Sequence, residues 1–199
     1  LEFAEKQVDE LITKGYDGIA LDGIGYNNYY ACFCPYCLEH LQKYAKKSGL
    51  QKNQATFRYY EDVLISFCNE LIRYAKKKKS GIIITGHVWP YFAPDPLYGN
   101  RIDFDYCGQT TSWFFYPHWA VDKMERYAYE IVRNQNAFFR RNLASPFIGI
   151  SASPERDVKS PERIREEIRI VKQSGARAIQ MAELGAIAGN PEIAAAVRG

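Results

Sequence analysis

Five short apolar segments, separated by longer stretches, constrain the fold of this chain most strongly. Each segment has the length of one β-strand, and most of the stretches between them carry apolar residues at helical spacing. Parallel strands need long crossover connections, whereas antiparallel strands can be joined by a tight turn, so the pattern predicts parallel β-α-β units. The expected strands cover 16–22, 81–86, 102–106, 147–151 and 176–181.

The connections carry the signals that begin and end helices. Residues 160–162, Ser-Pro-Glu, supply an N-cap, a proline at the first helical position and an acid in the first turn. Residues 190–191, Asn-Pro, open a last helix in the same way. Residues 90–100 are too rich in proline and aromatic side chains for a full crossover helix. The expected helices run over 1–14, 55–79, 118–142, 160–175 and from 191 onward.

Two architectures are built from such units, a closed (β/α)8 barrel and an open doubly wound sheet. The sequence contains neither GxGxxG nor a P-loop, which disfavours a nucleotide-binding open sheet. A strand that ends in Asp22 and continues into Gly23 is typical of the carboxyl-terminal mouth of a barrel. We therefore expect an α/β fold, a partial (β/α)8 TIM barrel comprising about the last five βα units.

The barrel is expected to form a single domain over residues 1–199. The chain starts within a helix that precedes a strand, so about three N-terminal βα units are expected to be missing.

The charge balance argues against nucleic acid as a partner. The 26 basic and 23 acidic residues give a formal net charge of +3, without the clustered basic face that DNA or RNA binding needs. No stretch is apolar enough to span a bilayer, so no membrane partner is expected. The sequence leaves the oligomeric state open, a homo-oligomer included.

A cluster of cysteines follows the first expected strand, in the segment Cys32-Phe-Cys34-Pro-Tyr-Cys37. Three thiolates this close in sequence can converge on zinc or an iron-sulfur centre, and zinc needs only a fourth ligand. The alternative is that they are buried free cysteines that behave as small hydrophobic residues. A disulfide would leave one thiol over. Free cysteines favour a cytoplasmic location.

The same cluster also supports a redox interpretation. Cys34-Pro-Tyr-Cys37 matches a glutaredoxin-type dithiol motif before a helix, where the helix dipole lowers a thiol pKa. The additional Cys32 and the distance from the strand end disfavour it. Thiol-disulfide oxidoreductase activity remains the alternative to metal binding.

The strand that ends in Asp22, followed by about ten loop residues and Cys-x-Cys-x-x-Cys, resembles the region after strand four of family 42 beta-galactosidases and related glycosyl-hydrolase-like barrels. The resemblance implies that Cys32, Cys34 and Cys37 are ligands of a structural zinc, and that Asp22 stands near the position of the catalytic acid. This sequence differs in having Asp-Gly at the strand end, where the galactosidases have Asn-Glu. It also lacks their upstream fourth cysteine, and neither Cys68 nor Cys107 is an obvious replacement.

Glycoside hydrolysis normally needs two carboxyl groups, one that protonates the leaving oxygen and one that acts as nucleophile or activates water. Asp22 is the first candidate. Glu183, after the last expected strand, is the preferred second one, because strand ends converge on one mouth in a barrel. Asp103 and Asp105, on one face of the middle strand, are the other candidates. A strand-end salt bridge or loop cap is the structural alternative for Asp103 and Asp105, and an ion pair with a basic neighbour is the alternative for Glu183.

Aromatic residues make up 15% of the chain, and many follow expected strands. Flat aromatic rings stack on the C–H faces of sugars, although they also pack at the base of loops. His87 is a candidate to hydrogen-bond a sugar hydroxyl or to tune a neighbouring carboxyl, and a structural hydrogen bond is its alternative role. The expected substrate-binding residues are Tyr26, His87, Trp89, Tyr91, Gln109 and Trp113.

These features predict a glycoside hydrolase that acts on O-glycosidic bonds of a carbohydrate substrate. Its carboxylate pair would lie at the barrel mouth, beside a structural zinc loop. The competing prediction is a non-catalytic barrel for carbohydrate binding or scaffolding.

Overall fold

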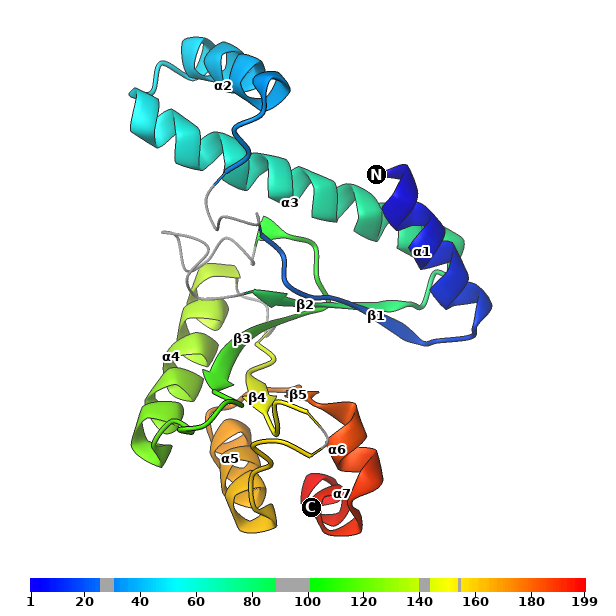
Figure 1. Ribbon diagram of the computed structural model, residues 1–199. Coiled ribbons are helices and arrows are strands. Elements are labelled where there is room, and N and C mark those ends of the chain that lie inside the picture. Colours follow the sequence, from blue (N-terminus) through cyan, green and yellow to red (C-terminus); the bar gives the residue numbers. More distant parts are fainter. Residues whose placement is uncertain (26–30, 89–100, 140–143, 154) are drawn as a thin grey trace. The chain divides into compact units, whose positions relative to one another are not determined.

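The structure is a computed structural model that describes residues 1–25, 31–88, 101–139, 144–153 and 155–199 (Figure 1). Helices and strands are interspersed along these residues. The chain divides into two compact units, Leu1–Phe104 and Asp105–Gly199, and each is described by itself.

The described residues of unit 1 form two parallel strands and three helices. Gly18 lies opposite Ile83 and Leu21 lies opposite Gly86 in the strand pair. Helices α1 and α2 both pack on the long helix α3 (Figure 1). The elements are α1 (Glu2–Thr13), β1 (Gly18–Leu21), α2 (Pro35–Ser48), α3 (Lys52–Lys78) and β2 (Ile83–Val88).

The core of unit 1 forms where apolar faces of α1 and α3 meet the strands. The helices bury one stripe each and leave their charged residues outside, as expected of amphipathic helices that cover a sheet. Burial of this surface is the main favourable contribution to folding of the unit. Its buried side chains include Val8, Ile19, Leu71, Ile72 and Ile84.

The ring of Phe104 packs closely on β2 at Gly86. The ring of Phe104, which is 2% exposed, occupies the space where a Cβ atom of residue 86 would lie. The absence of a side chain at Gly86 is therefore what allows Phe104 to pack on the strand.

Unit 2 contains three parallel strands and four helices among its described residues. Thr110 lies opposite Phe147, and Gly149 lies opposite Ala182, so β3, β4 and β5 pair in chain order. Helix α5 packs against both α4 and α7 (Figure 1). The elements are β3 (Tyr106–Ser112), α4 (Val121–Phe139), β4 (Phe147–Gly149), α5 (Pro161–Gln173), β5 (Gln180–Ala182), α6 (Leu184–Gly189) and α7 (Pro191–Arg198).

The helix starts predicted from the sequence are confirmed. The hydroxyl of Ser160 accepts a hydrogen bond from the backbone N–H of Arg163 at 3.2 Å. Oδ1 of Asn190 accepts from the backbone N–H groups of Glu192, at 2.9 Å, and Ile193, at 3.2 Å. Each cap satisfies N–H groups that have no partner within the helix.

An ion pair is buried beneath α5. Nζ of Lys159 lies 3.0 and 2.9 Å from the two carboxylate oxygens of Glu167, and both side chains are fully buried. The ammonium also donates to the hydroxyl of Ser112, at the end of β3. Burial lowers the pKa of Lys159, and the charge of Glu167 opposes that change. The pair links the end of β3 to α5 through polar contacts inside an apolar core.

One predicted strand is wrong. The alternating apolar residues of 102–106 suggest a strand, but Ile102 and Phe104 pack as buried residues of a non-strand segment, and β3 covers Tyr106–Ser112. Strand β3 could not be predicted from hydrophobicity, because three of its buried residues, Thr110, Thr111 and Ser112, are polar. The buried hydroxyl of Thr111 has a hydrogen-bond partner, because it donates to the carbonyl of Phe147 at 2.9 Å.

The other predicted strands and all predicted helices are present, with shifted ends. Strand β2 extends past Gly86 to Val88, so His87 lies within the strand rather than in its loop. Within each unit the strands are parallel, follow chain order and have helices between them, which is the repeating pattern of a (β/α)8 barrel. The five described strands form part of such a barrel, as the sequence predicts.

Candidate functional site

The ends of β1 and β2 bring Asp22 and His87 together. Asp22 directly follows β1, and His87 lies near the end of the neighbouring parallel strand. Nδ1 of His87 lies 2.9 Å from Oδ1 of Asp22, and the backbone N–H of Gly23 donates to the same oxygen at 2.8 Å. The side chain of Asp22 is 72% exposed and that of His87 is 6% exposed. The carboxylate of Asp22 is therefore exposed to solvent and is held in place by its hydrogen bond to the buried imidazole of His87.

This arrangement favours the ionised form of Asp22. The hydrogen bond from His87 lowers the pKa of Asp22, and it outweighs partial burial, which acts in the opposite direction. The N–H of Gly23 contributes to the same effect. Hydrogen bonds to a carboxylate stabilise its charge, so Asp22 is suited to act as a nucleophile, a base or an electrostatic partner.

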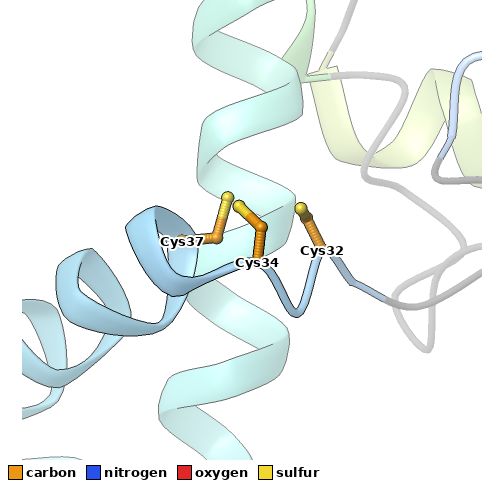
Figure 2. A group of neighbouring side chains, drawn as sticks. All are labelled: Cys32, Cys34 and Cys37. Carbon is orange, nitrogen blue, oxygen red and sulfur yellow. The ribbon is translucent and has the colours of Figure 1, made fainter.

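The three cysteines of the loop converge before α2. Figure 2 shows the side chains of Cys32, Cys34 and Cys37 together at the start of that helix. Their sulfur atoms all lie within 4.8 Å of one another. Ideal tetrahedral zinc, with Zn–S bonds of about 2.3 Å, places its sulfurs about 3.8 Å apart. The arrangement thus fits a metal site, with small adjustments of the side chains.

Local structure explains the convergence. Cys34 is the N-cap residue of α2 and Pro35 takes the first helical position, which turns the chain so that Cys37 faces back toward Cys34. The hydroxyl of Tyr60, on α3, donates to the carbonyl of Cys32 and ties the loop to that helix. Tyr60 is 2% exposed, so this tie lies in the core of unit 1.

The thiols differ in acidity in the absence of metal. The backbone N–H of Cys37 lowers the pKa of Cys34, which is exposed. The hydrogen bond that Cys37 makes with Cys34 raises the pKa of Cys37 to about 12. One thiolate therefore forms first, at Cys34, and its neighbour keeps its proton.

The two remaining cysteines lie elsewhere. Cys68 is 1% exposed on α3, and burial raises its pKa to about 12. Cys107 is fully buried in β3 of unit 2. Both behave as core residues, in agreement with the expectation that neither completes the cluster.

Glu183 follows β5 and serves as the N-cap of α6. Its Oε1 accepts a hydrogen bond from the backbone N–H of Gly185 at 3.0 Å. Its Oε2 is buried and has no hydrogen-bond partner among the described residues. The described residues form no ion pair with Glu183, which was the structural alternative for this residue, and one carboxylate oxygen has no partner among them.

Trp113 directly follows β3, within a cluster of aromatic side chains. Its ring is stacked on that of Trp119, with centroids 6.2 Å apart and an angle of 15° between the planes. The ammonium of Lys123 lies 3.8 Å from the centroid of Trp119. Trp119 thus has aromatic and cationic neighbours, and the cluster stiffens the loop after β3.

Three predicted residues of the middle strand are placed differently from the expectation. Gln109 lies within β3 rather than in a loop after it. Asp103 and Asp105 precede β3, so they stand at its N-terminal end instead of the carboxyl-terminal mouth. The backbone N–H of Asp103 donates to the side-chain oxygen of Asn69 at 2.7 Å, as part of the entry to the strand. The prediction that Asp103 and Asp105 share one face of a strand is also wrong, because neither residue belongs to a strand.

Three predicted sugar-binding residues, Tyr26, Trp89 and Tyr91, lie outside the described residues. The contact between His87 and Asp22 is of the kind expected of a histidine that tunes a neighbouring carboxyl, although the sequence does not identify Asp22 as that carboxyl. Strand register brings the two side chains together, because the preceding residues Leu21 and Gly86 lie opposite each other in the parallel pair.

Comparisons with known proteins identify the fold class. No protein-family model matches the chain, and no curated protein matches it in sequence. Among solved structures, a bee venom hyaluronidase in complex with a hyaluronic acid tetramer is similar, with a TM-score of 0.56 and 15% identity. That match covers 87% of this chain and 64% of the hyaluronidase chain.

A second similar structure is the PgaB (BpsB) glycoside hydrolase domain from Bordetella bronchiseptica. Its TM-score is 0.58 at 13% identity, over 90% of this chain and 55% of that chain. These similarities show a fold that glycoside hydrolases also adopt. The chain spans less than two thirds of both structures. The specific resemblance to family 42 beta-galactosidases stays a prediction.

No described helix is long and apolar enough to cross a membrane.

Proposed function

We propose that this chain forms part of a glycoside hydrolase, with Asp22 as one of its two catalytic carboxyl groups. The observation that carries the proposal is the hydrogen bond between Asp22 and His87 at adjacent strand ends. An exposed carboxylate held by a buried imidazole is positioned without being neutralised. Similarity of the fold to two glycoside hydrolases supports the reaction class.

The role of Asp22 follows from its charge. Glycoside hydrolysis passes through a transition state with positive charge at the anomeric carbon, which an ionised carboxylate stabilises as nucleophile or through activated water. The hydrogen bond from His87 favours that ionised form. Although resemblance to the galactosidases implies the acid position for Asp22, its surroundings favour this second role.

Glu183 is the second proposed catalytic carboxyl group. Its Oε1 is held by the N–H of Gly185, and its Oε2 has no hydrogen-bond partner among the described residues. Glu183 follows β5 of unit 2, and the carboxyl ends of barrel strands are the usual source of catalytic groups.

Turnover tests the proposal. The parent protein is assayed on a panel of aryl glycosides and oligosaccharides, including hyaluronan fragments. Asp22→Asn is expected to reduce kcat by about 10²- to 10⁴-fold while retaining sugar binding. The matched control is Asp17→Asn, because Asp17 stands before β1, is 98% exposed and only pairs with Lys79. Sugar binding without turnover by the parent would instead support the non-catalytic barrel.

We also propose that Cys32, Cys34 and Cys37 hold a structural zinc ion. The convergence of three sulfur atoms within 4.8 Å supports it. Bound zinc would join the loop, the start of α2 and, through Tyr60, helix α3. Elemental analysis of purified protein should find about one equivalent of zinc, and Cys34→Ser should lower that content. Metal-free protein whose thiols cycle with glutathione would favour the redox alternative.

A further inference from the structure

The cysteine cluster supplies three ligands, whereas a structural zinc site is closed by four. The sulfur atoms converge at the N-terminal end of α2, so the described residues best placed to supply a fourth ligand lie in the first turns of that helix and in the facing part of α3. Only side chains with a nitrogen, sulfur or carboxylate donor qualify.

Most nearby donors already have partners. Glu39, on α2, forms an ion pair with Lys43 at 2.6 Å. On α3, Glu61 lies 3.3 Å from Arg101, and Asp62 binds the same guanidinium. Recruiting any of these acids would break an ion pair.

Cys68 is too far along α3. It lies eight residues after Tyr60, the residue that contacts the loop, which corresponds to about 12 Å of helix. Its thiol is also buried in the core of the unit.

His40 differs from these residues in both position and partners. It lies three residues after Cys37 on α2, and residues at this spacing share one helix face. Side chains of a helix lean toward its N-terminus, so His40 leans toward the turn that holds the cluster. Its ring packs on that of Tyr36, with centroids 4.3 Å apart. His40 makes no hydrogen bond to another described residue.

We propose that His40 is the fourth ligand, which makes the segment a Cys-x-Cys-x2-Cys-x2-His zinc site. This inference rests on the proposed zinc loop. The imidazole nitrogens lie outside the group of sulfur atoms that are within 4.8 Å of one another, so the ring turns toward Cys37 when zinc binds. His40 is only half-buried, which leaves room for that rotation.

The coordination chemistry favours this ligand set. Three thiolates and one neutral imidazole around Zn²⁺ leave one net negative charge, whereas four thiolates leave two. That charge lies at the N-terminal end of α2, where the helix dipole stabilises an anion. The site therefore needs no further cation.

The experiment measures zinc affinity by chelator competition and records the spectrum of the Co²⁺-substituted protein. His40→Ala is expected to weaken zinc binding roughly 100-fold or more, because one of four ligands is lost. The d–d bands of Co²⁺ should change in the same variant. Glu39→Gln, one residue away and engaged with Lys43, is the matched control and should match the parent.

A second variant distinguishes the loss of a zinc ligand from a folding defect caused by the substitution. His40→Cys can supply a fourth thiolate, so it should keep tight binding and strengthen the sulfur-to-cobalt charge-transfer band. Unchanged zinc affinity and an unchanged Co²⁺ spectrum in His40→Ala would overturn the assignment of His40.

A parent protein that binds no zinc would overturn the metal site as a whole. Both failures are distinguishable from failure of the hydrolase proposal, which the turnover of Asp22→Asn tests separately.

Discussion

Nδ1 of His87 lies 2.9 Å from Oδ1 of Asp22, across two neighbouring parallel strands. The imidazole is almost completely buried and the carboxylate is largely exposed, so the buried residue positions the exposed one. This relationship predicts how the pKa of Asp22 responds when His87 is replaced.

Replacing His87 by Phe should raise the pKa of Asp22, because the largest contribution that lowers it is removed. The acid limb of the kcat/KM profile, where Asp22 takes up a proton, should move to higher pH. His87→Asn keeps an N–H donor near the position of Nδ1 and should move the limb less. An NMR titration of the Asp22 carboxyl carbon measures the same change without any substrate, and an unaltered titration in His87→Phe would contradict the prediction.

The same interaction makes a contribution to stability with a definite sign. A carboxyl group whose pKa is lower in the folded state stabilises the fold above its unfolded pKa, and that contribution disappears as pH falls through the folded value. The parent should therefore lose more stability on acidification than His87→Phe does. Urea denaturation of both proteins at neutral and acidic pH tests this difference.

Gly86→Ala should destabilise unit 1, because the added methyl group would overlap the ring of Phe104. Overpacking of this kind typically costs about 1–3 kcal/mol. Gly81→Ala is the matched control, since no atom lies within 4 Å of a Cβ built there. Urea denaturation midpoints of the two variants should differ clearly, and equal midpoints would show that Phe104 can move aside.

Lys159→Met should destabilise unit 2, because the buried carboxylate of Glu167 loses the ammonium and keeps only the guanidinium of Arg163, whose Nε lies 2.6 Å from Oε1. Since Arg163 remains, the cost should lie below the roughly 3–5 kcal/mol typical of breaking a buried pair completely. The double variant Lys159→Met/Glu167→Met removes both charges and should recover much of the loss. Arg169→Met breaks an exposed pair with Glu166 on the same helix and should hardly shift the denaturation midpoint.

Removal of zinc should loosen α2 selectively. This helix has no fully buried residue, and its contacts with α3 include the hydrogen bond from Tyr44 to Asp62 at 2.9 Å. With so little buried surface, α2 depends on the cysteine loop for its position. Amide hydrogen exchange in Pro35–Ser48 should accelerate after chelation, while α5 in unit 2 remains unchanged. Equal protection with and without chelator would contradict a structural role for zinc.

Periodicity predicts the elements whose burial is carried by apolar residues. The long helix α3 and the caps at Ser160 and Asn190 appear where the sequence places them. Strand β3 does not, because its buried residues are mainly polar and satisfy their hydrogen bonds within the unit. Thr111 and Ser112 do so through Phe147 and Lys159, partners that a local pattern does not contain.

In the candidate site, too, local spacing predicts some contacts, whereas contacts between residues distant in sequence could not be predicted. Spacing alone predicts that Cys32, Cys34 and Cys37 converge, because a segment of six residues that ends in a helix start leaves the side chains few other arrangements. The contact between Asp22 and His87 spans 65 positions and depends on strand register, which the sequence does not reveal. The capping role of Glu183 depends in turn on α6, a short helix with no strong sequence signal.

The aromatic cluster after β3 has a practical consequence for spectroscopy. The chain has three tryptophans, and Trp113 and Trp119 both lie in unit 2, stacked on each other beside Lys123. Replacing Trp89 by Phe would leave these two as the sole indole emitters. The fluorescence of that variant would then follow the melting of the C-terminal unit by itself, while circular dichroism follows the whole chain.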